Sequence, residues 1–316
     1  MNKVRTAVIG VGYLGRFHAQ KYAQLAQSEL VAVVDADAAT RERVAQETRC
    51  RPVADFREIL GEVDALSIAT PTPLHHPIAR ACLEHGVHVL VEKPITETLE
   101  QARDLVRLAA ERGLVLTVGH LERFNSAILA LEGTLTTPRF VESHRLAPFK
   151  ERGTDVNVVL DLMIHDIDLI QSLVGAPIES IDAVGTSVFS AGLDIANARI
   201  RYANGCVANT TASRVSMKVE RKLRLFQDDA YVSIDLQQKV LTIVRKPGEA
   251  AAAAPGQVTI EERSYEQGDA LKLEIEAFLA SISGVRPPVV TGEDGLRALE
   301  AAIRITELVH ADQTAR

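Results

Sequence analysis

A carboxylate and an imidazole four residues apart form the most suggestive chemical pair in this 316-residue chain. Asp161 and His165 stand in the segment DLMIHDID, whose apolar residues recur at helical spacing. Because residues i and i+4 share one face of a helix, the carboxylate can orient the ring and raise its basicity. The spacing therefore predicts a general base at His165. A polar stripe facing solvent is the alternative, and Asp168 could compete with Asp161 for the ring.

A lysine at the end of an apolar run is the second candidate. Lys93 stands in VEKPIT, where its ammonium could stabilise the alkoxide charge that develops as a hydroxyl is oxidised. A solvated surface charge is the alternative. The bond between Lys93 and Pro94 is a candidate cis peptide. His75 and His76, in the earlier segment TPTPLHH, point in different directions and have no evident third partner, so no metal site is predicted.

A glycine-rich turn near the start predicts a dinucleotide site. Gly10, Gly12 and Gly15 follow a short apolar run and open a helical segment, and Asp35 ends the next apolar run, 20 residues beyond Gly15. This context is the dinucleotide fingerprint, in which the pyrophosphate lies on the helix N-terminus. Asp35 can accept hydrogen bonds from both ribose hydroxyls and would repel a 2′-phosphate. NAD is therefore favoured over NADP.

The elements that must position these residues alternate between strand and helix in the first 120 residues. The apolar runs are continuous, which is typical of parallel strands covered by helices on both faces. A doubly wound parallel sheet is therefore expected. Its strands are expected at 4–9, 30–34, 65–69, 87–91 and 114–118, and its helices at 13–26, 38–48, 77–84 and 99–111, with Asp37 and Gly113 as caps.

Residues 121–316 are expected to form an α+β domain for substrate binding and oligomerisation. This domain would be built on a large, mostly antiparallel sheet. Residues 1–120 would form the NAD-binding domain, and the two closing helices would pack back near it. An Ala-rich loop is expected at 249–256. The expected helices are 155–173, 269–283 and 292–311, and the expected strands are 181–189, 196–202, 207–213, 221–227, 230–236, 239–245 and 258–262.

Composition excludes several other classes. The formal net charge of −7 argues against a sequence-independent nucleic-acid binder. The chain has no Trp, so a sugar would be held by hydrogen bonds and charge instead of Trp stacking. Cys50, Cys82 and Cys206 predict neither a disulfide framework nor a thiolate zinc site. No apolar run reaches the ~18 residues of a membrane span, and no leader is evident, so a cytoplasmic protein is expected.

Four motifs, VIGVGYLGRFHA, ATPTPLH, VEKPIT and DLMIHDIDL, resemble in this order those of the Gfo/Idh/MocA oxidoreductases. These NAD(P)-dependent enzymes act mostly on sugars, cyclitols and their derivatives. The resemblance extends over nearly the whole chain and implies catalytic roles for Lys93, Asp161 and His165. It also implies the following cofactor contacts: Gly10, Gly12, Tyr13, Leu14, Gly15, Asp35, Thr70, Pro71, His75, Glu92 and Lys93.

A narrower resemblance rests on GHLERFN at 119–125 together with LMIHDIDL. Both segments are similar to the branch that oxidises UDP-N-acetylglucosamine at C3. In that branch the 3-keto product feeds a PLP aminotransferase, which makes a 2,3-diamino sugar for lipid A. The cations of RLAPFKERG are candidates for the diphosphate. The substrate contacts expected on this basis are His120, Arg123, Asn125, Arg145, Lys150, Arg152, Asp161 and His165.

Two other hypotheses stay open. One is a dehydrogenase of another nucleotide sugar, a free sugar or inositol. The other is a non-catalytic dinucleotide-binding sensor, against which the presence of Lys93, Asp161 and His165 counts. An antiparallel sheet must also cover its second face. Relatives commonly do so by pairing sheets, so a homodimer or homotetramer is expected.

Overall fold

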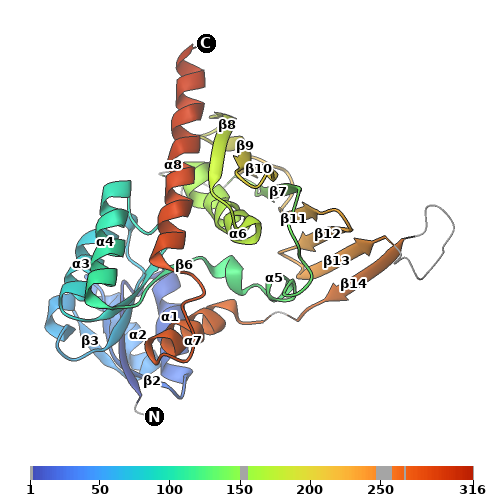
Figure 1. Ribbon diagram of the computed structural model, residues 1–316. Coiled ribbons are helices and arrows are strands. Elements are labelled where there is room, and N and C mark those ends of the chain that lie inside the picture. The colour runs from blue at the N-terminus through green and yellow to red at the C-terminus, as the bar shows by residue number, and fades with distance from the viewer. Residues whose placement is uncertain (1–2, 150–155, 247–257, 267, 316) are drawn as a thin grey trace. The chain divides into compact units, whose positions relative to one another are not determined.

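The computed structural model describes residues 3–149, 156–246, 258–266 and 268–315 (Figure 1). It divides into two compact units, one of residues 1–121 with 269–297 and one of residues 122–268 with 298–316. Two of the expected substrate cations, Lys150 and Arg152, lie outside the described residues, as does the loop expected at 249–256. None of the described helices is long and apolar enough to cross a membrane.

The first unit is built on a six-stranded parallel sheet in the order β3-β2-β1-β4-β5-β6. The strands are β1 (Val4–Ile9), β2 (Ser28–Val34), β3 (Arg51–Val53), β4 (Ala65–Ile68), β5 (His88–Glu92) and β6 (Leu116–Gly119). The strand order reverses between β1 and β4, and open sheets bind ligands at the carboxyl ends of the strands at such a point. The doubly wound sheet is confirmed, with β3 as a short edge strand that the sequence did not predict.

Helices cover both faces of this sheet. They are α1 (Tyr13–Gln24), α2 (Ala38–Thr48), α3 (His75–Glu84), α4 (Leu99–Arg112) and α7 (Ala270–Ile282). Helices α1, α2 and α7 share one buried apolar cluster with the strands, which includes Tyr22 and Phe278. Two predicted caps are confirmed. The Asp37 carboxylate accepts from the Thr40 N–H at 2.8 Å, and Gly113 ends α4 with a left-handed φ of 63°.

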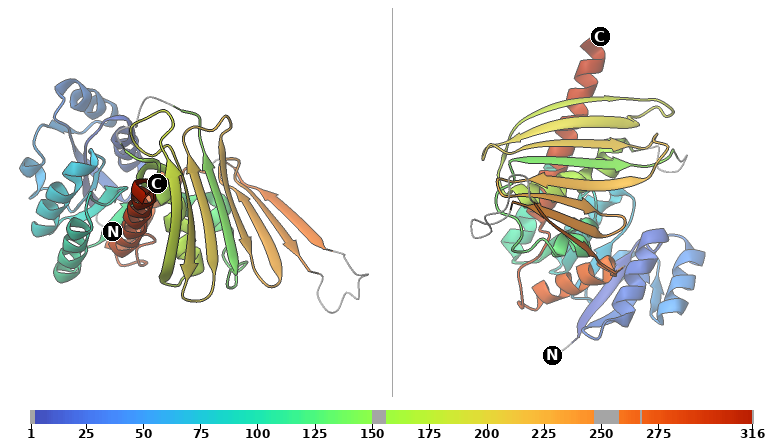
Figure 2. Two further views of the ribbon diagram at one scale, coloured as in Figure 1. Left: turned by 90° about the horizontal axis from the view of Figure 1, so that it is seen from above. Right: turned by 90° about the vertical axis from the view of Figure 1, so that its right-hand side faces the viewer.

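The second unit is built on an eight-stranded sheet in the order β14-β13-β12-β11-β7-β10-β9-β8, whose strands lie side by side in Figure 2. Burial alternates along strands such as β9, so one face packs on the core. All pairings are antiparallel except that of β7 with β10. The strands are β7 (Phe140–Leu146), β8 (Ile178–Thr186), β9 (Ile195–Tyr202), β10 (Val207–Ser213), β11 (Glu220–Phe226), β12 (Ala230–Asp235), β13 (Val240–Arg245) and β14 (Thr259–Ser264).

The helix carrying Asp161 and His165 differs from the expected single α-helix. Its first turn is a π-helix, η4 (Val159–Met163), and it continues as α6 (Ile164–Val174). The Asn157 side chain accepts from the N–H groups of Val159 and Leu160 at 3.0 Å and so begins the helix. Single π turns inside helices are frequent at functional sites. The unit also contains the short α5 (Ser126–Leu129), and the residues of α8 (Gly292–Ala315) from 298 onward belong to it.

Candidate active site

The glycine turn between β1 and α1 is shaped for a close ligand. Gly10 has a φ of +80°, and a Cβ at Gly15 would lie 1.8 Å from the Gly10 carbonyl oxygen, so both positions need glycine. By contrast, a Cβ at Gly12 would meet nothing within 4 Å. Helix α1 has Gly12 as its N-cap, so no side chain caps its first N–H groups. The turn therefore offers an open helix N-terminus to a diphosphate, as the fingerprint predicts.

Asp35 is fixed at the end of β2 by two backbone donors. Its Oδ2 accepts from the Val11 N–H at 2.9 Å and its Oδ1 accepts from the Asp37 N–H at 3.0 Å. This ties the carboxylate to the glycine turn. Arg41 was not predicted from the sequence to lie here. Its guanidinium donates to the Asp35 carbonyl at 3.3 Å and to the Ala36 carbonyl at 3.1 Å.

A pocket of about 400 Å³ lies beside Asp35 within the first unit. Its size falls within the range of small-molecule sites. Apolar side chains make up most of its wall, and two acids, Asp35 and Asp55, lie at it. Its position next to the glycine turn fits the adenosine half of a dinucleotide. The lining residues are Ile9, Val34, Asp35, Ala54, Asp55, Phe56, Arg57, Leu74, Pro77, Ile78 and Ala81.

His75 joins the loops that follow β4 and β5. Its Nδ1 lies 2.9 Å from the Pro94 carbonyl oxygen and its Nε2 lies 2.8 Å from the Thr70 carbonyl oxygen, and the side chain is buried. The ring therefore sets the spacing of two loops at the ligand edge of the sheet. The adjacent His76 is turned elsewhere, because its Nε2 lies 3.0 Å from Asp104 Oδ2.

Lys93 follows the last residue of β5, and its peptide bond to Pro94 is cis, as the sequence predicted. The preceding residue, Glu92, turns into the interior. Its Oε1 lies 3.0 Å from Nε2 of His18, a buried residue of α1 that was not among the predicted site residues. Glu92 lies opposite Gly119 on β6, where a Cβ would come within 2.8 Å of Glu92 Oε2. Glycine at 119 thus leaves room for the carboxylate.

In the second unit, Asp161 lies in the π turn and His165 one turn later in α6, and both are partly exposed. The carboxylates of Asp166 and Asp168, which follow in the same helix, are each paired with an arginine. Asp168 accepts from Arg123 Nε and Nη2 at 2.6 and 2.8 Å, and Asp166 is likewise paired with an arginine. Asp168 is therefore engaged by Arg123.

Comparison with known proteins identifies the family of this chain. Residues 4–120 match the description "Oxidoreductase family, NAD-binding Rossmann fold", and residues 135–314 match its C-terminal alpha/beta domain. The chain belongs to the Gfo/Idh/MocA oxidoreductase family. It is 43% identical over 312 residues to a UDP-N-acetylglucosamine 3-dehydrogenase from Acidithiobacillus ferrooxidans, covering 98% of this chain and 99% of the relative. The crystal structure of that dehydrogenase superposes with a TM-score of 0.91 over 98% of this chain and 99% of that one.

More distant members of the family share the fold. A scyllo-inositol 2-dehydrogenase from Bacillus subtilis is 27% identical over 326 residues, covering 96% of this chain and 94% of the relative. A scyllo-inositol dehydrogenase from Lactobacillus casei, solved with NAD(H) and scyllo-inositol, has a TM-score of 0.79 at 21% identity, with 98% of each chain covered. This Gfo/Idh/MocA member is thus an oxidoreductase with a nicotinamide dinucleotide domain.

Two of the expected substrate contacts of this oxidoreductase have other roles in its fold. The Arg145 guanidinium donates to Asp166 at 2.9 and 3.0 Å and to Glu122 at 3.0 Å, and only 4% of its surface is exposed. Arg145 is therefore corrected from a diphosphate contact to a buried structural cation. Asn125 is also buried; its amide donates to the Leu236 carbonyl at 2.9 Å and its oxygen accepts from the Ala127 N–H at 3.1 Å.

Two other expected contacts, Arg123 and His120, are also largely buried. Besides pairing with Asp168, Arg123 retains 13% side-chain exposure. His120, directly after β6, is buried, and its N–H donates to the Val118 carbonyl at 2.7 Å. Both remain candidates for substrate recognition in this oxidoreductase.

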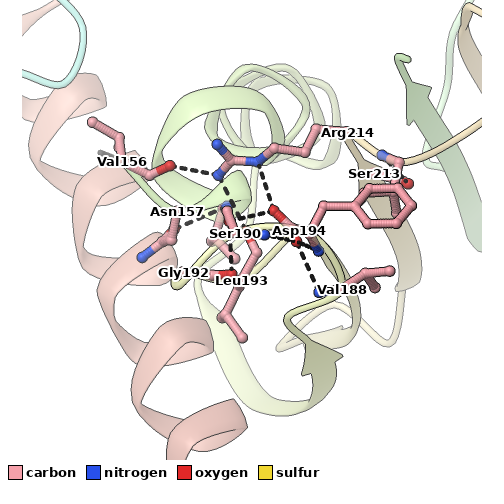
Figure 3. A network of polar contacts seen from close by, with 12 residues as sticks. Val156, Asn157, Val188, Ser190, Gly192, Leu193, Asp194, Ser213 and Arg214 are labelled. Atoms are coloured by element: carbon pink, nitrogen blue, oxygen red, sulfur yellow. Dashed lines mark hydrogen bonds and ion pairs between the residues drawn. The ribbon is translucent and has the colours of Figure 1, made fainter. Parts of the chain in front are cut away.

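A buried polar network holds the start of the helix that carries Asp161 (Figure 3). Asp194 accepts from the N–H groups of Val188, Phe189 and Ser190 at 2.7–2.9 Å and from the Ser190 hydroxyl at 2.5 Å. Arg214 donates to the carbonyls of Val156 and Leu193. The network thus joins the loop before β9 to the residues that begin η4. It was not predicted, because isolated Asp and Arg residues carry no spacing signal.

Proposed function

We propose that this enzyme uses NAD to oxidise the C3 hydroxyl of UDP-N-acetylglucosamine to a 3-keto sugar. The strongest support is the 43% identity, over 98% of the chain, to a dehydrogenase named for that reaction. The presence of Lys93, Asp161 and His165 supports catalysis over a sensor role. Inositol dehydrogenases are similar at lower identity, 27% for the Bacillus subtilis enzyme, and a free polyol is the alternative substrate class.

The cofactor choice rests on Asp35. Its carboxylate is fixed by two backbone N–H groups, so it cannot easily turn away from a ribose. A 2′-phosphate there would face this negative charge. The guanidinium of Arg41 is bonded to two backbone carbonyls. We therefore infer a preference for NAD, with Gly10, Gly12 and Gly15 shaping the turn for the diphosphate.

In the proposed reaction the C3–H and O–H bonds break and a C3 carbonyl forms. Bound NAD would supply the hydride acceptor at C4 of its nicotinamide. The imidazole of His165 takes the hydroxyl proton, and Asp161 orients the ring or holds a sugar hydroxyl. The Lys93 ammonium stabilises the charge that develops on the oxygen. The products are the ketone, the reduced cofactor and a proton that is released to solvent.

The 3-keto product suggests a partner enzyme that consumes it. A PLP aminotransferase could convert the ketone to an amine, giving a 2,3-diamino sugar of the kind used in lipid A. Removing the ketone in this way would also draw forward an oxidation that is unfavourable near neutral pH. We further infer a cytoplasmic location. A homodimer or homotetramer is supported by strands such as β9, which leave alternate side chains exposed on one face of the large sheet.

The test is incubation of the enzyme with NAD and a panel of UDP-sugars, with NADH absorbance as the readout. Glutamate and a partner aminotransferase are added to pull the equilibrium. UDP-N-acetylglucosamine should give NADH and, with the partner, a diamino sugar identified by mass spectrometry. Turnover of inositol or free sugars without any response to UDP-sugars would instead establish the alternative.

A further inference from the structure

Three ionisable side chains meet in the interior of the first unit. They are His18 on α1, Glu92 at the end of β5 and Glu274 on α7. One ring nitrogen of His18 and one carboxylate oxygen of each glutamate lie within 4.8 Å of one another. His18 is 0% exposed and Glu274 is 4% exposed. The proposed mechanism uses none of these groups as acid or base. The mechanism therefore does not explain why this cluster, which includes the residue directly before Lys93, lies in the interior.

Glu274 has an unusual environment for a carboxyl group. Neither of its oxygens has a hydrogen-bond partner among the described residues. A bare carboxylate in such a place would be costly, because burial without a partner removes its hydration. A neutral carboxylic acid avoids most of that cost. Burial raises the pKa of Glu274 well above its usual range, and the charge of Glu92 raises it further.

The charge that acts on Glu274 is the negative charge of Glu92. From α1 it is faced by His18 and by Tyr22, whose hydroxyl lies 2.9 Å from Ser67 Oγ. Burial raises the pKa of Tyr22, so this side chain stays neutral. From β5 it is faced by Glu92. The Lys21 ammonium, also on α1, is paired with Asp269 at 2.7 Å.

We propose that Glu274 is protonated at neutral pH and directs its O–H toward the Glu92 carboxylate, which makes it a positioning residue for the end of β5. Two carboxyl groups that share a site hold one proton between them, because both cannot ionise at close range. The shared proton leaves a single negative charge on the two carboxyl groups. Glu92 is held by His18 on one side, by the close approach to Gly119 on another, and by Glu274.

The position of the Glu92 side chain also affects Lys93, the next residue in the chain. Because Lys93 directly follows Glu92, the direction in which β5 ends is set by the anchored Glu92 side chain. Ionisation of Glu274 would place a second negative charge beside Glu92 and push the two side chains apart. The catalytic role of Lys93 rests on the proposed function, whereas the protonation of Glu274 does not.

A bound divalent cation is the other arrangement that one imidazole and two carboxylates could serve. It is less favoured because His18 Nε2 already lies at hydrogen-bond distance from Glu92, at 3.0 Å. A hydrogen bond accounts for this contact without a metal. The purified enzyme is therefore also analysed for metals by mass spectrometry. A stoichiometric divalent ion that is lost in Glu274→Gln would overturn the proposal.

Infrared spectroscopy of the full-length enzyme at pH 8 tests the proton directly. The wild type should show the C=O stretch of a protonated carboxylic acid, and Glu274→Gln should lack it. The matched control is Glu276→Gln on the same helix, where Glu276 is more exposed and lies 3.9 Å from the Lys272 ammonium. The control should retain the band. Absence of the band from the wild type would overturn the proposal.

The stability profile gives a second test that does not depend on the substrate. Between the ordinary Glu pKa of about 4.3 and the raised value, the native state holds a proton that the unfolded chain has released. Raising the pH through this window should favour unfolding, by up to about tenfold in the equilibrium constant per pH unit. Glu274→Gln should lack this component in urea unfolding at several pH values. An unchanged slope in that variant would count against the proton.

The positioning role has its own readout. In Glu274→Gln, a neutral isostere, the alkaline limb of the kcat/KM profile should move to higher pH, while the rate near neutrality stays within a few-fold of wild type. Glu274→Leu should lower kcat by about tenfold or more at all pH values, since small displacements of a catalytic group are costly. If the infrared band is present but no UDP-sugar is oxidised, the proposed function fails while the protonated Glu274 stands. Unchanged pH profiles in both variants would remove the positioning role.

Discussion

The Arg145 guanidinium and the Asp166 carboxylate form a buried bidentate ion pair that ties the central strand β7 to helix α6. The two hydrogen bonds measure 2.9 and 3.0 Å, and the residues are 4% and 2% exposed. Burial alone would lower the pKa of Arg145, but Asp166 and Glu122 raise it above its usual range. The cation is therefore permanent, and the helix that carries His165 is anchored to the sheet.

Replacing Arg145 with Met should destabilise the protein by about 3–5 kcal/mol, because it leaves Asp166 buried without its partner. Urea unfolding measures this loss. The control is Arg221→Met, a half-exposed residue 3.7 Å from Glu122, which should change stability by ~1 kcal/mol or less. A normal unfolding curve with a raised KM for the UDP-sugar would instead return Arg145 to the diphosphate site.

Lys93→Met should lower kcat by roughly 10²–10³-fold, the effect of removing one group that stabilises developing negative charge. NAD affinity, followed by cofactor fluorescence or calorimetry, should change far less than kcat. Lys272→Met, on the exposed side of α7, is the matched control and should leave the rate unchanged. Retention of the wild-type rate in Lys93→Met would show that the assignment is wrong.

His165→Asn should lower kcat by about 10²–10⁴-fold and flatten the acidic limb of its pH profile, because a general base is lost. Asp161→Asn should have a smaller effect and should move that limb toward lower pH, since a carboxylate raises the basicity of the imidazole. Steady-state rates between pH 5 and 9 separate the two. An identical pH profile in all three proteins would place the base elsewhere.

Asp35→Ser should shift the cofactor preference toward NADP. The substitution removes the acceptor for the ribose hydroxyls and the charge that repels a 2′-phosphate, so the NADP-to-NAD ratio of kcat/KM should rise by at least about tenfold, or ~1.4 kcal/mol. Asp37→Ser is the control, because serine also caps a helix and Asp37 holds the Thr40 N–H. An unchanged NADP-to-NAD ratio in Asp35→Ser would show that Asp35 does not contact the ribose.

Asp194→Asn should remove a pH-dependent part of the stability. Burial would raise the pKa of Asp194, but hydrogen bonds from Ser190 and the backbone N–H groups lower it below its usual range. Its stabilisation is thus present above the unfolded pKa of about 3.9 and is lost as the pH falls through the folded value. Acid unfolding followed by circular dichroism should show a shallower transition in the variant. The same slope in both proteins would contradict the assignment.

Much of the fold followed from sequence patterns. The first unit was predictable because parallel strands covered on both faces are continuous apolar runs, and the caps at Asp37 and Gly113 carry local signals. The strand β7 was missed because its residues FVESHRL contain four polar side chains. Their partners lie far along the chain: β7 pairs with β10 and β11. Such pairings leave no local mark in the sequence.

The candidate site was predictable where chemistry depends on spacing and not where it depends on tertiary partners. The glycine turn, Asp35 and the cis Lys93–Pro94 bond were recognised from neighbouring residues. The role of Arg145 was misjudged because an arginine in a loop-like segment does not reveal the buried acids that it meets. The π turn at Asp161 was also invisible, since its apolar spacing resembles that of an α-helix.

The position of α7 in the chain bears on how the protein is made. Its side chains Leu271, Ile275 and Phe278 belong to the same buried cluster as Val8 and Val33 of the first strands, although more than two hundred residues are synthesised between them. On the ribosome, folding usually begins with the N-terminal domain. The parallel sheet would therefore keep part of its apolar surface exposed until α7 has been synthesised. The nascent chain therefore offers a chaperone a binding surface until translation is almost complete.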